Sequence, residues 1–93
     1  MSESKGIHCI VSGLVQGVFY RASTEDMANS LKLTGWVKNM PNGNVELQAF
    51  GNQEDLDKLV VWLWKGPSAA KVSDVKVNYI DIQEEFKGFV IKY

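Results

Sequence analysis

Residues 36–50 read WVKNMPNGNVELQAF and lie at the centre of the chain. Residues 36–40 and 45–50 are rich in the apolar, β-branched and aromatic side chains that favour strands. Between them stands Pro41-Asn42-Gly43-Asn44. Asn-Gly between two such runs is a strong hairpin signal, because both residues accept a positive φ. The stretch therefore predicts two antiparallel strands joined by a tight turn.

Downstream of this hairpin the sequence predicts a helix that begins after Asn52, whose side chain can cap it. Glu54 and Asp55 fall in the first turn, where the helix dipole favours acids. Lys65 suits the last turn, and Gly66-Pro67 prevents continuation. The apolar residues are spaced i, i+3, i+4 and i+7, as one buried helix face requires, at Leu56, Leu59, Val60 and Leu63.

Upstream of the hairpin, residues 7–13 (IHCIVSG) are short, apolar and β-branched, and predict a strand buried on much of both faces. Residues 13–21 contain two glycines and no helical period, and predict a loop. A helix is expected next. Ser23 or a neighbour would cap it, Glu25 and Asp26 would lie near its positive end, and Gly35 would stop it. Its apolar face would hold Met27, Ala28 and Leu31.

Two further strands are expected towards the end of the sequence. Residues 72–82 alternate, but Val75, Val77 and Tyr79 share one parity whereas Ile80 and Ile82 take the other, which predicts a bulge or bend there. The last strand would alternate at Phe89, Ile91 and Tyr93, after a turn at Glu84-Glu85.

The resulting order is strand, helix, strand, strand, helix, strand, strand. Two βα units around a hairpin predict an α+β fold, a ferredoxin-like α/β sandwich (βαββαβ plus a short C-terminal strand) with both helices on one face of a mostly antiparallel sheet. The 93 residues leave room for one domain, 1–93, with residues 1–5 expected as a flexible tail.

The composition of the chain excludes several classes of protein. A net charge of −1 argues against a dedicated nucleic-acid binder, because such binding depends on excess Lys and Arg. No apolar run reaches the roughly 18–20 residues of a membrane span, and the polar start does not resemble a secretory leader. The single Cys9 cannot form an internal disulfide. We therefore expect a cytoplasmic monomer that binds neither nucleic acid nor membrane.

Familiar catalytic sets are missing from the sequence. The only histidine, His8, lies within the first strand, where a solvated or hydrogen-bonded role is the simplest interpretation. Cys9 adjoins it and should point to the opposite face as a buried, inert thiol. One Cys and one His cannot make a structural zinc site, so no metal ligands are assigned.

The remaining candidate is residues 13–21, GLVQGVFYR. A glycine-containing loop that leads into a helix N-terminus presents backbone N–H groups and a positive dipole end, which together suit an anion. Arg21 adds a planar guanidinium that can hold two phosphoryl oxygens. On these residues alone, a tight turn with a surface arginine is an equally good interpretation.

Residues 13–21 also resemble the N-terminal signature of the acylphosphatase family, and residues 36–46 (WVKNMPNGNVE) resemble its second signature. The resemblance covers nearly the whole chain. It implies a ferredoxin-like fold and hydrolysis of acyl phosphates to a carboxylate and inorganic phosphate, without metal or cofactor. The ligands expected from it are small acyl phosphates and, as product-like anions, phosphate or sulfate.

The resemblance also implies roles for individual residues. Arg21 matches the family's phosphate-binding arginine and Asn39 its water-positioning asparagine. The backbone amide cradle would be formed by Val15, Gln16, Gly17, Val18, Phe19 and Tyr20. Two departures are mild: Tyr20 stands where Phe is more common, and Lys92 where Arg is frequent.

Two other functions remain open at this point. The same sandwich could be a non-catalytic module that binds anions or a partner, and turnover of benzoyl phosphate would separate that module from an enzyme. An RNA-binding domain of this fold is the other alternative, because residues 87–93 (KGFVIKY) carry strand aromatics. The balanced charge gives it little attraction for phosphates.

Overall fold

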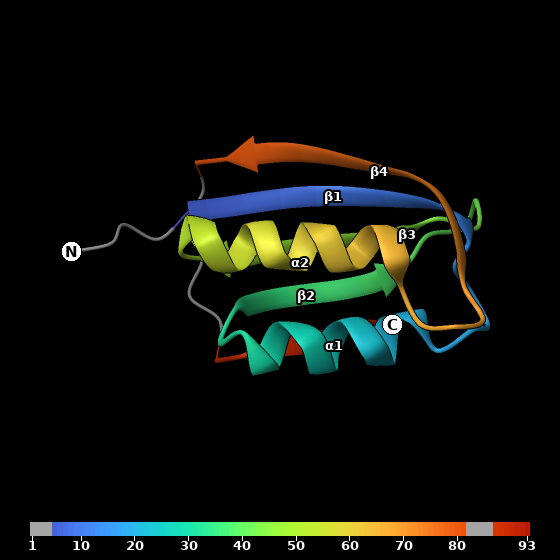
Figure 1. The fold of residues 1–93 in the computed structure, drawn as a ribbon, viewed down its shortest axis with the longest axis horizontal. Helices are drawn as coiled ribbons and strands as arrows, with labels where there is room; N and C mark the ends of the chain where they lie inside the picture. The colour runs from blue at the N-terminus through green and yellow to red at the C-terminus, as the bar shows by residue number, and fades with distance from the viewer. Residues whose placement is uncertain (1–4, 82–86) are drawn as a thin grey trace.

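The computed structural model describes residues 5–81 and 87–93. In this part of the chain five strands and two helices follow the predicted order (Figure 1). Their bounds are β1 Lys5–Leu14, α1 Tyr20–Ser30, β2 Thr34–Asn39, β3 Val45–Gly51, α2 Gln53–Lys65, β4 Lys71–Ile80 and β5 Phe89–Ile91. β1 begins at Lys5, a residue that was expected to belong to a flexible tail. The predicted turn at Glu84-Glu85, and Ile82, lie outside the described residues.

The strands form one mixed sheet in the order β4-β1-β3-β2-β5. The β1–β3, β1–β4 and β2–β3 pairs are antiparallel, and the edge strand β5 runs parallel to β2. Both helices cover the same face of the sheet (Figure 1). This is the predicted ferredoxin-like sandwich.

The core lies between the sheet and the two helices. Alternate residues of β1 are fully buried there (Ile7, Cys9 and Val11), and Leu47 of β3 lies beside them. From α2 the core receives Leu56, Leu59 and Leu63, as the apolar stripe predicted. Asn52 caps this helix as predicted, because its side-chain oxygen accepts a hydrogen bond of 2.9 Å from the Asp55 amide.

The first helix differs from its prediction at both ends. It begins at Tyr20, inside the stretch expected to be loop, and neither Ser23 nor any other side chain caps it. Glu25 and Asp26 therefore lie beyond its first turn. The helix ends at Ser30, and Lys32 takes the left-handed conformation after it with φ 58°.

The residue expected to stop this helix, Gly35, is instead inside β2. A Cβ on Gly35 would lie 2.0 Å from the carbonyl oxygen of Gln48 on the neighbouring strand. Close contact between two strands, and not helix termination, is therefore the reason for glycine at this position.

The β2–β3 turn and the strand β4 also differ in detail from expectation. In the β2–β3 turn only Gly43 has a positive φ, 95°, whereas Asn42 does not. Asn42 instead accepts a hydrogen bond of 3.0 Å from the Asn44 amide through its side-chain oxygen. In β4 the register against β1 shifts at Ser73 and is regular from Asp74 to Ile80, whereas the predicted bulge or bend involves Ile82, outside the described residues.

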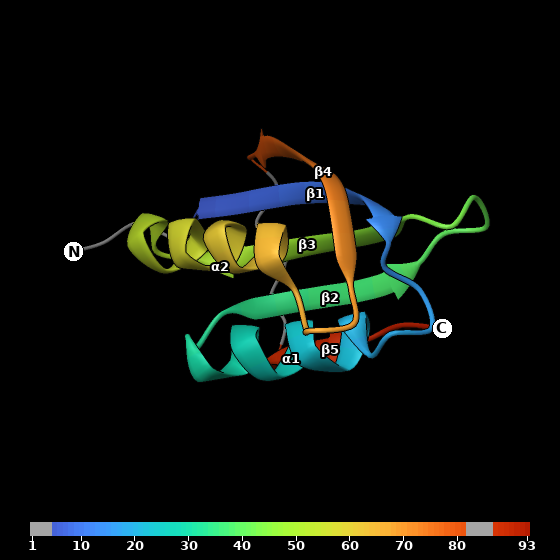
Figure 2. The ribbon, with the colours of Figure 1, turned by 45° about the vertical axis from the view of Figure 1, so that its right-hand side comes forward.

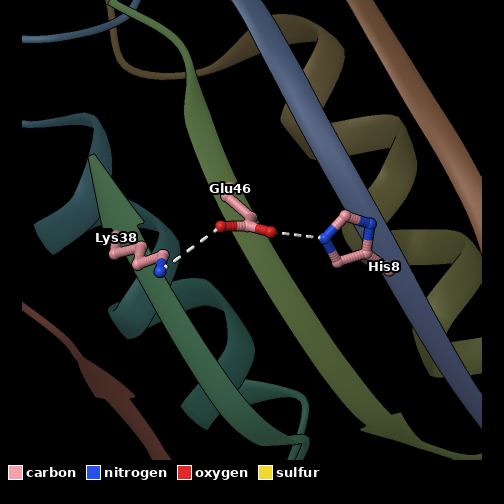
Figure 3. A network of polar contacts seen from close by, with 3 residues as sticks. All are labelled: His8, Lys38 and Glu46. Atoms are coloured by element: carbon pink, nitrogen blue, oxygen red, sulfur yellow. Dashed lines mark hydrogen bonds and ion pairs between the residues drawn. The ribbon is translucent and has the colours of Figure 1, made fainter. Parts of the chain in front are cut away.

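His8 and Cys9 point to opposite faces of the sheet, as predicted. Cys9 is buried in the core, and burial raises the pKa of its thiol to about 12. His8 lies on the face away from the helices, where its Nε2 is 2.7 Å from an oxygen of Glu46 (Figure 3). The other oxygen of Glu46 is 3.6 Å from Lys38 Nζ. This half-exposed network spans three strands and lies across the sheet from the helices, consistent with a structural histidine.

Candidate active site

One cavity of about 280 Å³ opens where β1 passes into α1. The end of β2, the start of α1 and the C-terminal residues lie at the same end of the molecule (Figure 2). The cavity lining comes from these three places and from the loop between β1 and α1: Val15, Gly17, Phe19, Tyr20, Arg21, Ala22, Asn39, Ile91 and Tyr93.

The loop after β1 forms one wall of the cavity. Its backbone takes a positive φ at two positions, Gly17 and Phe19. Gly17 has φ 75°, and a Cβ on it would meet no atom within 4 Å, so open space lies beside it. Phe19 has φ 64° and is the N-cap of α1. A left-handed conformation costs an ordinary residue about 1–2 kcal/mol. The loop therefore holds Phe19 in a strained conformation at the wall of the cavity.

Amide groups at the start of α1 give this wall its polarity. The first backbone hydrogen bond of the helix joins the Ser23 amide to the Phe19 carbonyl at 3.0 Å. The amides before it, of Tyr20, Arg21 and Ala22, have no helical carbonyl to bond, and the positive end of the helix dipole lies there. All three residues line the cavity. This wall is therefore suited to an anion.

Arg21 adds a full positive charge to that wall, and it is the only arginine in the sequence. Its guanidinium carbon lies 5.1 Å from the centre of the Tyr93 ring. A guanidinium stacked on an aromatic face keeps its N–H edges available for an oxyanion. Tyr93 thus supports the arginine from one side.

Asn39 reaches the same cavity from the last position of β2. Among the described residues its Oδ1 is a buried side-chain oxygen without a hydrogen-bond partner. Buried polar atoms are nearly always paired, by protein or by an ordered molecule. An acceptor of this kind at a cavity wall is suited to a water molecule or a bound ligand.

The structure thus brings Arg21 and Asn39 to one cavity, together with four of the six expected cradle residues: Val15, Gly17, Phe19 and Tyr20. Two cradle residues do not line it. The Val18 side chain packs against the core. Gln16 instead turns towards the β2–β3 hairpin, where its side-chain nitrogen donates hydrogen bonds of 2.8 Å to the Met40 and Asn44 carbonyls.

Sequence reasoning assigned no site role to Ala22, Ile91 or Tyr93. Ile91 pairs with Val37 in the parallel register of β5 and β2, and the Lys92 amide bonds the Val37 carbonyl at 2.8 Å. This pairing carries the chain onward towards Asn39. The alternation of Ile91 and Tyr93 was the available signal, but no local pattern showed which strand lay beside them.

The hydroxyl of Tyr20 has a role away from the cavity. It donates a buried hydrogen bond of 2.6 Å to the Leu63 carbonyl in the last turn of α2. Burial of this hydroxyl raises the pKa of Tyr20. The ring also packs against Trp62, with 5.7 Å between ring centres. Trp64 is more exposed, so one of the two helix tryptophans packs against Tyr20 and the other faces solvent.

Comparison with known proteins gives consistent results. Residues 7–91 match the family model for Acylphosphatase. An acylphosphatase of Pelotomaculum thermopropionicum is 48% identical over the full length of both chains. The structure of an acylphosphatase from Coxiella burnetii is similar with a TM-score of 0.91 and 45% identity, over 96% of this chain and 93% of that one. The crystal structure of acylphosphatase from Bacillus subtilis gives a TM-score of 0.93 with 36% identity, over 96% and 99%.

Proposed function

Since the chain belongs to the acylphosphatase family, we propose that it hydrolyses acyl phosphates to a carboxylate and inorganic phosphate in the cavity lined by Arg21 and Asn39. The observation that carries this site assignment is the meeting of three groups in one cavity: a guanidinium, the free amides of a helix start, and a buried carboxamide oxygen without a partner.

The phosphoryl group binds to the cationic wall. Phosphoryl transfer passes through a loose transition state that spreads charge over the equatorial oxygens, so positioning and electrostatic stabilisation supply most of the catalysis. Arg21 and the amides of the loop and of the first turn of α1 hold those oxygens. Because these donors are fixed by the fold, they need little reorganisation as charge develops.

Asn39 orients the attacking water. Its buried Oδ1 accepts a hydrogen bond from that water and aims the water's oxygen at phosphorus. The new P–O bond forms as the bond between phosphorus and the acyl oxygen breaks. The electron pair of the broken bond leaves on the carboxylate, and the water hydrogens remain with the phosphate product.

A general acid or base is not needed for this reaction. The conjugate acid of a carboxylate leaving group has a pKa of about 4, so the group departs without protonation. In a loose transition state there is little bonding to the nucleophile, so its proton need not be removed first. The chemistry therefore fits a cavity that offers a cation, amides and one carboxamide.

Substitution of the two residues tests these roles with acetyl phosphate as substrate and phosphate as inhibitor. Replacing one donor aimed at developing charge typically lowers the rate about 10²–10³-fold, so Arg21→Gln should reduce kcat/KM at least that much and also weaken phosphate inhibition. Asn39→Ala should lower kcat about 10²-fold while the phosphate inhibition constant changes little. Asn78→Ala, on the exposed part of β4, is the matched control.

If Asn39→Ala weakened phosphate binding as strongly as it lowered kcat, the role of Asn39 in orienting the water would be rejected. A folded wild-type chain that bound phosphate but never turned over acetyl or benzoyl phosphate would favour the non-catalytic module instead.

We also propose that the protein acts as a monomer in a reducing cytoplasm. Its one cysteine is a buried free thiol. No helix in residues 5–81 and 87–93 is long and apolar enough to cross a membrane. Sedimentation at micromolar concentrations tests the monomer, and fractionation of cells tests the compartment.

A further inference from the structure

The Phe19 ring is not needed for the backbone conformation at its position. The loop requires φ 64° there, and glycine or asparagine adopts such a conformation with less strain than phenylalanine. The backbone geometry therefore explains a positive φ at residue 19 but does not explain an aromatic side chain.

The hydrophobic core does not explain the ring either. The Phe19 side chain is 81% exposed, whereas the adjacent Tyr20 is buried and packs against Trp62. Solvent exposure of a single apolar side chain is common and by itself has no meaning. An exposed aromatic ring at a strained position beside a cavity is different, because strain of this kind gathers at functional sites.

The surroundings of Phe19 identify what the ring can contact. The exposure of the lining residues shows which of them lie at the mouth of the cavity and which lie inside it. Phe19 and Tyr93 are highly exposed and lie at the mouth, whereas Val15 is buried and lies inside. Ile91 adds an aliphatic side chain to the same lining. The phosphate-binding groups described above therefore lie beside an apolar mouth that contains two aromatic rings.

We propose that Phe19 is a specificity-determining residue, whose ring binds the acyl group of the substrate and makes the enzyme prefer acyl phosphates with large apolar or aromatic acyl groups. The inference rests on the proposed function, because the phosphoryl group must occupy the cationic wall. When it does, the acyl group is the part of the substrate that extends towards the mouth. There an aromatic or long aliphatic group contacts Phe19, and an acetyl group offers only one methyl.

The expected effect is moderate. Apolar pockets distinguish substrates that differ by one methylene about 10–200-fold. Because the mouth is open to solvent, we expect the lower end of that range, about tenfold, for a phenyl group against a methyl group.

The experiment compares two substrates, benzoyl phosphate and acetyl phosphate, in each variant. Phe19→Asn keeps a residue that tolerates positive φ and removes the apolar ring. The ratio of kcat/KM for benzoyl over acetyl phosphate should fall about tenfold, with Phe19→Leu in between. The difference in intrinsic reactivity between the substrates is the same in every variant, so it cancels when the ratio of a variant is compared with that of the wild type. Leu14→Asn removes another exposed apolar side chain, which does not line the cavity, and should leave the ratio unchanged.

Binding provides a readout that does not depend on turnover. In 2-oxo-2-phenylethylphosphonate and acetonylphosphonate a methylene replaces the bridging oxygen, so neither can be hydrolysed at that bond. The phenyl compound should bind the wild type about tenfold more tightly than the methyl compound, and Phe19→Asn should abolish that preference.

The inference is overturned if Phe19→Asn and Phe19→Leu leave both the kinetic ratio and the binding preference at wild-type values, or if Leu14→Asn changes them equally. That outcome would leave acyl phosphate hydrolysis intact. Failure of the wild type to hydrolyse either substrate would instead overturn the proposed function, and this inference with it.

Discussion

The side-chain nitrogen of Gln16 lies 2.8 Å from the carbonyl oxygen of Met40, although 24 residues separate them in sequence. Met40 directly follows Asn39. The same nitrogen donates to the Asn44 carbonyl, which also accepts the Met40 amide at 2.8 Å across the turn. One side chain therefore joins the loop that would bind phosphate to the hairpin that carries Asn39.

Replacing Gln16 by methionine should loosen that connection. Gln16→Met retains the length of the side chain but removes both donated hydrogen bonds, and each such bond contributes about 0.5–1.5 kcal/mol. We expect the free energy of unfolding, measured in urea, to fall by about 1–2 kcal/mol. We also expect kcat to fall more than the affinity for phosphate.

Gln53→Met is the matched control for this change. Gln53 bonds two exposed partners, Asp57 and Tyr79, and exposed bonds of this kind contribute little. Equal losses of stability in the two variants would show that the join between loop and hairpin has no special importance.

Arg21 can be tested by chemical modification as well as by substitution, because the sequence contains no other arginine. An arginine-selective dicarbonyl such as phenylglyoxal should inactivate the enzyme as this one guanidinium is modified. Phosphate should protect, because it would occupy the same N–H groups. Mass spectrometry of the digested protein gives the modified position, and activity lost without modification of residue 21 would contradict the assignment.

Tyr20 offers a test of packing beneath the site. Its hydroxyl donates a hydrogen bond to the Leu63 carbonyl, in a helix turn where carbonyls lack intrahelical partners. Tyr20→Phe should lower the free energy of unfolding by about 1–2 kcal/mol, because a buried acceptor loses its donor. The control is Tyr79→Phe, whose hydroxyl is exposed and whose loss should change stability by less than about 0.5 kcal/mol.

The buried thiol of Cys9 predicts a dependence of stability on alkaline pH. Burial raises its pKa from 9.0 to about 12, so the folded state retains a proton that the unfolded state loses. The stabilisation is complete below about pH 9 and declines as the pH rises towards 12. Burial of the Tyr20 hydroxyl acts in the same direction.

Thermal unfolding of the wild type and of Cys9→Ala between pH 7 and 11 measures this effect, and the variant should show the smaller decline. The native thiol should also resist a thiol reagent at pH 8 until the protein unfolds. Rapid labelling without unfolding would show that the thiol is accessible.

Much of this fold could be predicted because its signals are local. The cap at Asn52, the apolar stripe of α2 and the turn around Gly43 each depend on residues a few positions apart. Helix and hairpin signals of this length depend mainly on backbone preference and on one buried face. They were enough to give the element order and, from it, the sandwich.

The errors occurred where tertiary contact overrides local preference. Phe19 adopts a positive φ that its residue type disfavours, so α1 begins earlier than Ser23 suggested. Position 35 lies in a strand and is occupied by glycine because the Gln48 backbone is too close for any side chain. Neither constraint can be predicted from the sequence pattern of a few neighbouring residues.

The candidate site divides in the same way. Arg21 and Asn39 were identified because the motifs around them resemble those of a family. Without that resemblance, a tight turn with a surface arginine explained residues 13–21 equally well. Tyr93 was not assigned, because its position beside Arg21 depends on the parallel pairing of β5 with β2. Pairing of distant segments is set by the whole sheet and cannot be derived from the last few residues.

The order of the strands also has a consequence for how the protein folds. The partners of β1 come late in the sequence: Lys5 pairs with Gly51, and Leu14 with Lys71. Long segments must close before these pairs stabilise anything, and proteins dominated by such distant pairings fold slowly for their size. The loop that leads to Arg21 starts from the end of β1, so its place beside the rest of the sheet depends on these distant pairs. We therefore expect enzymatic activity to return during refolding only as fast as the sheet forms, and slowly for a chain of this size.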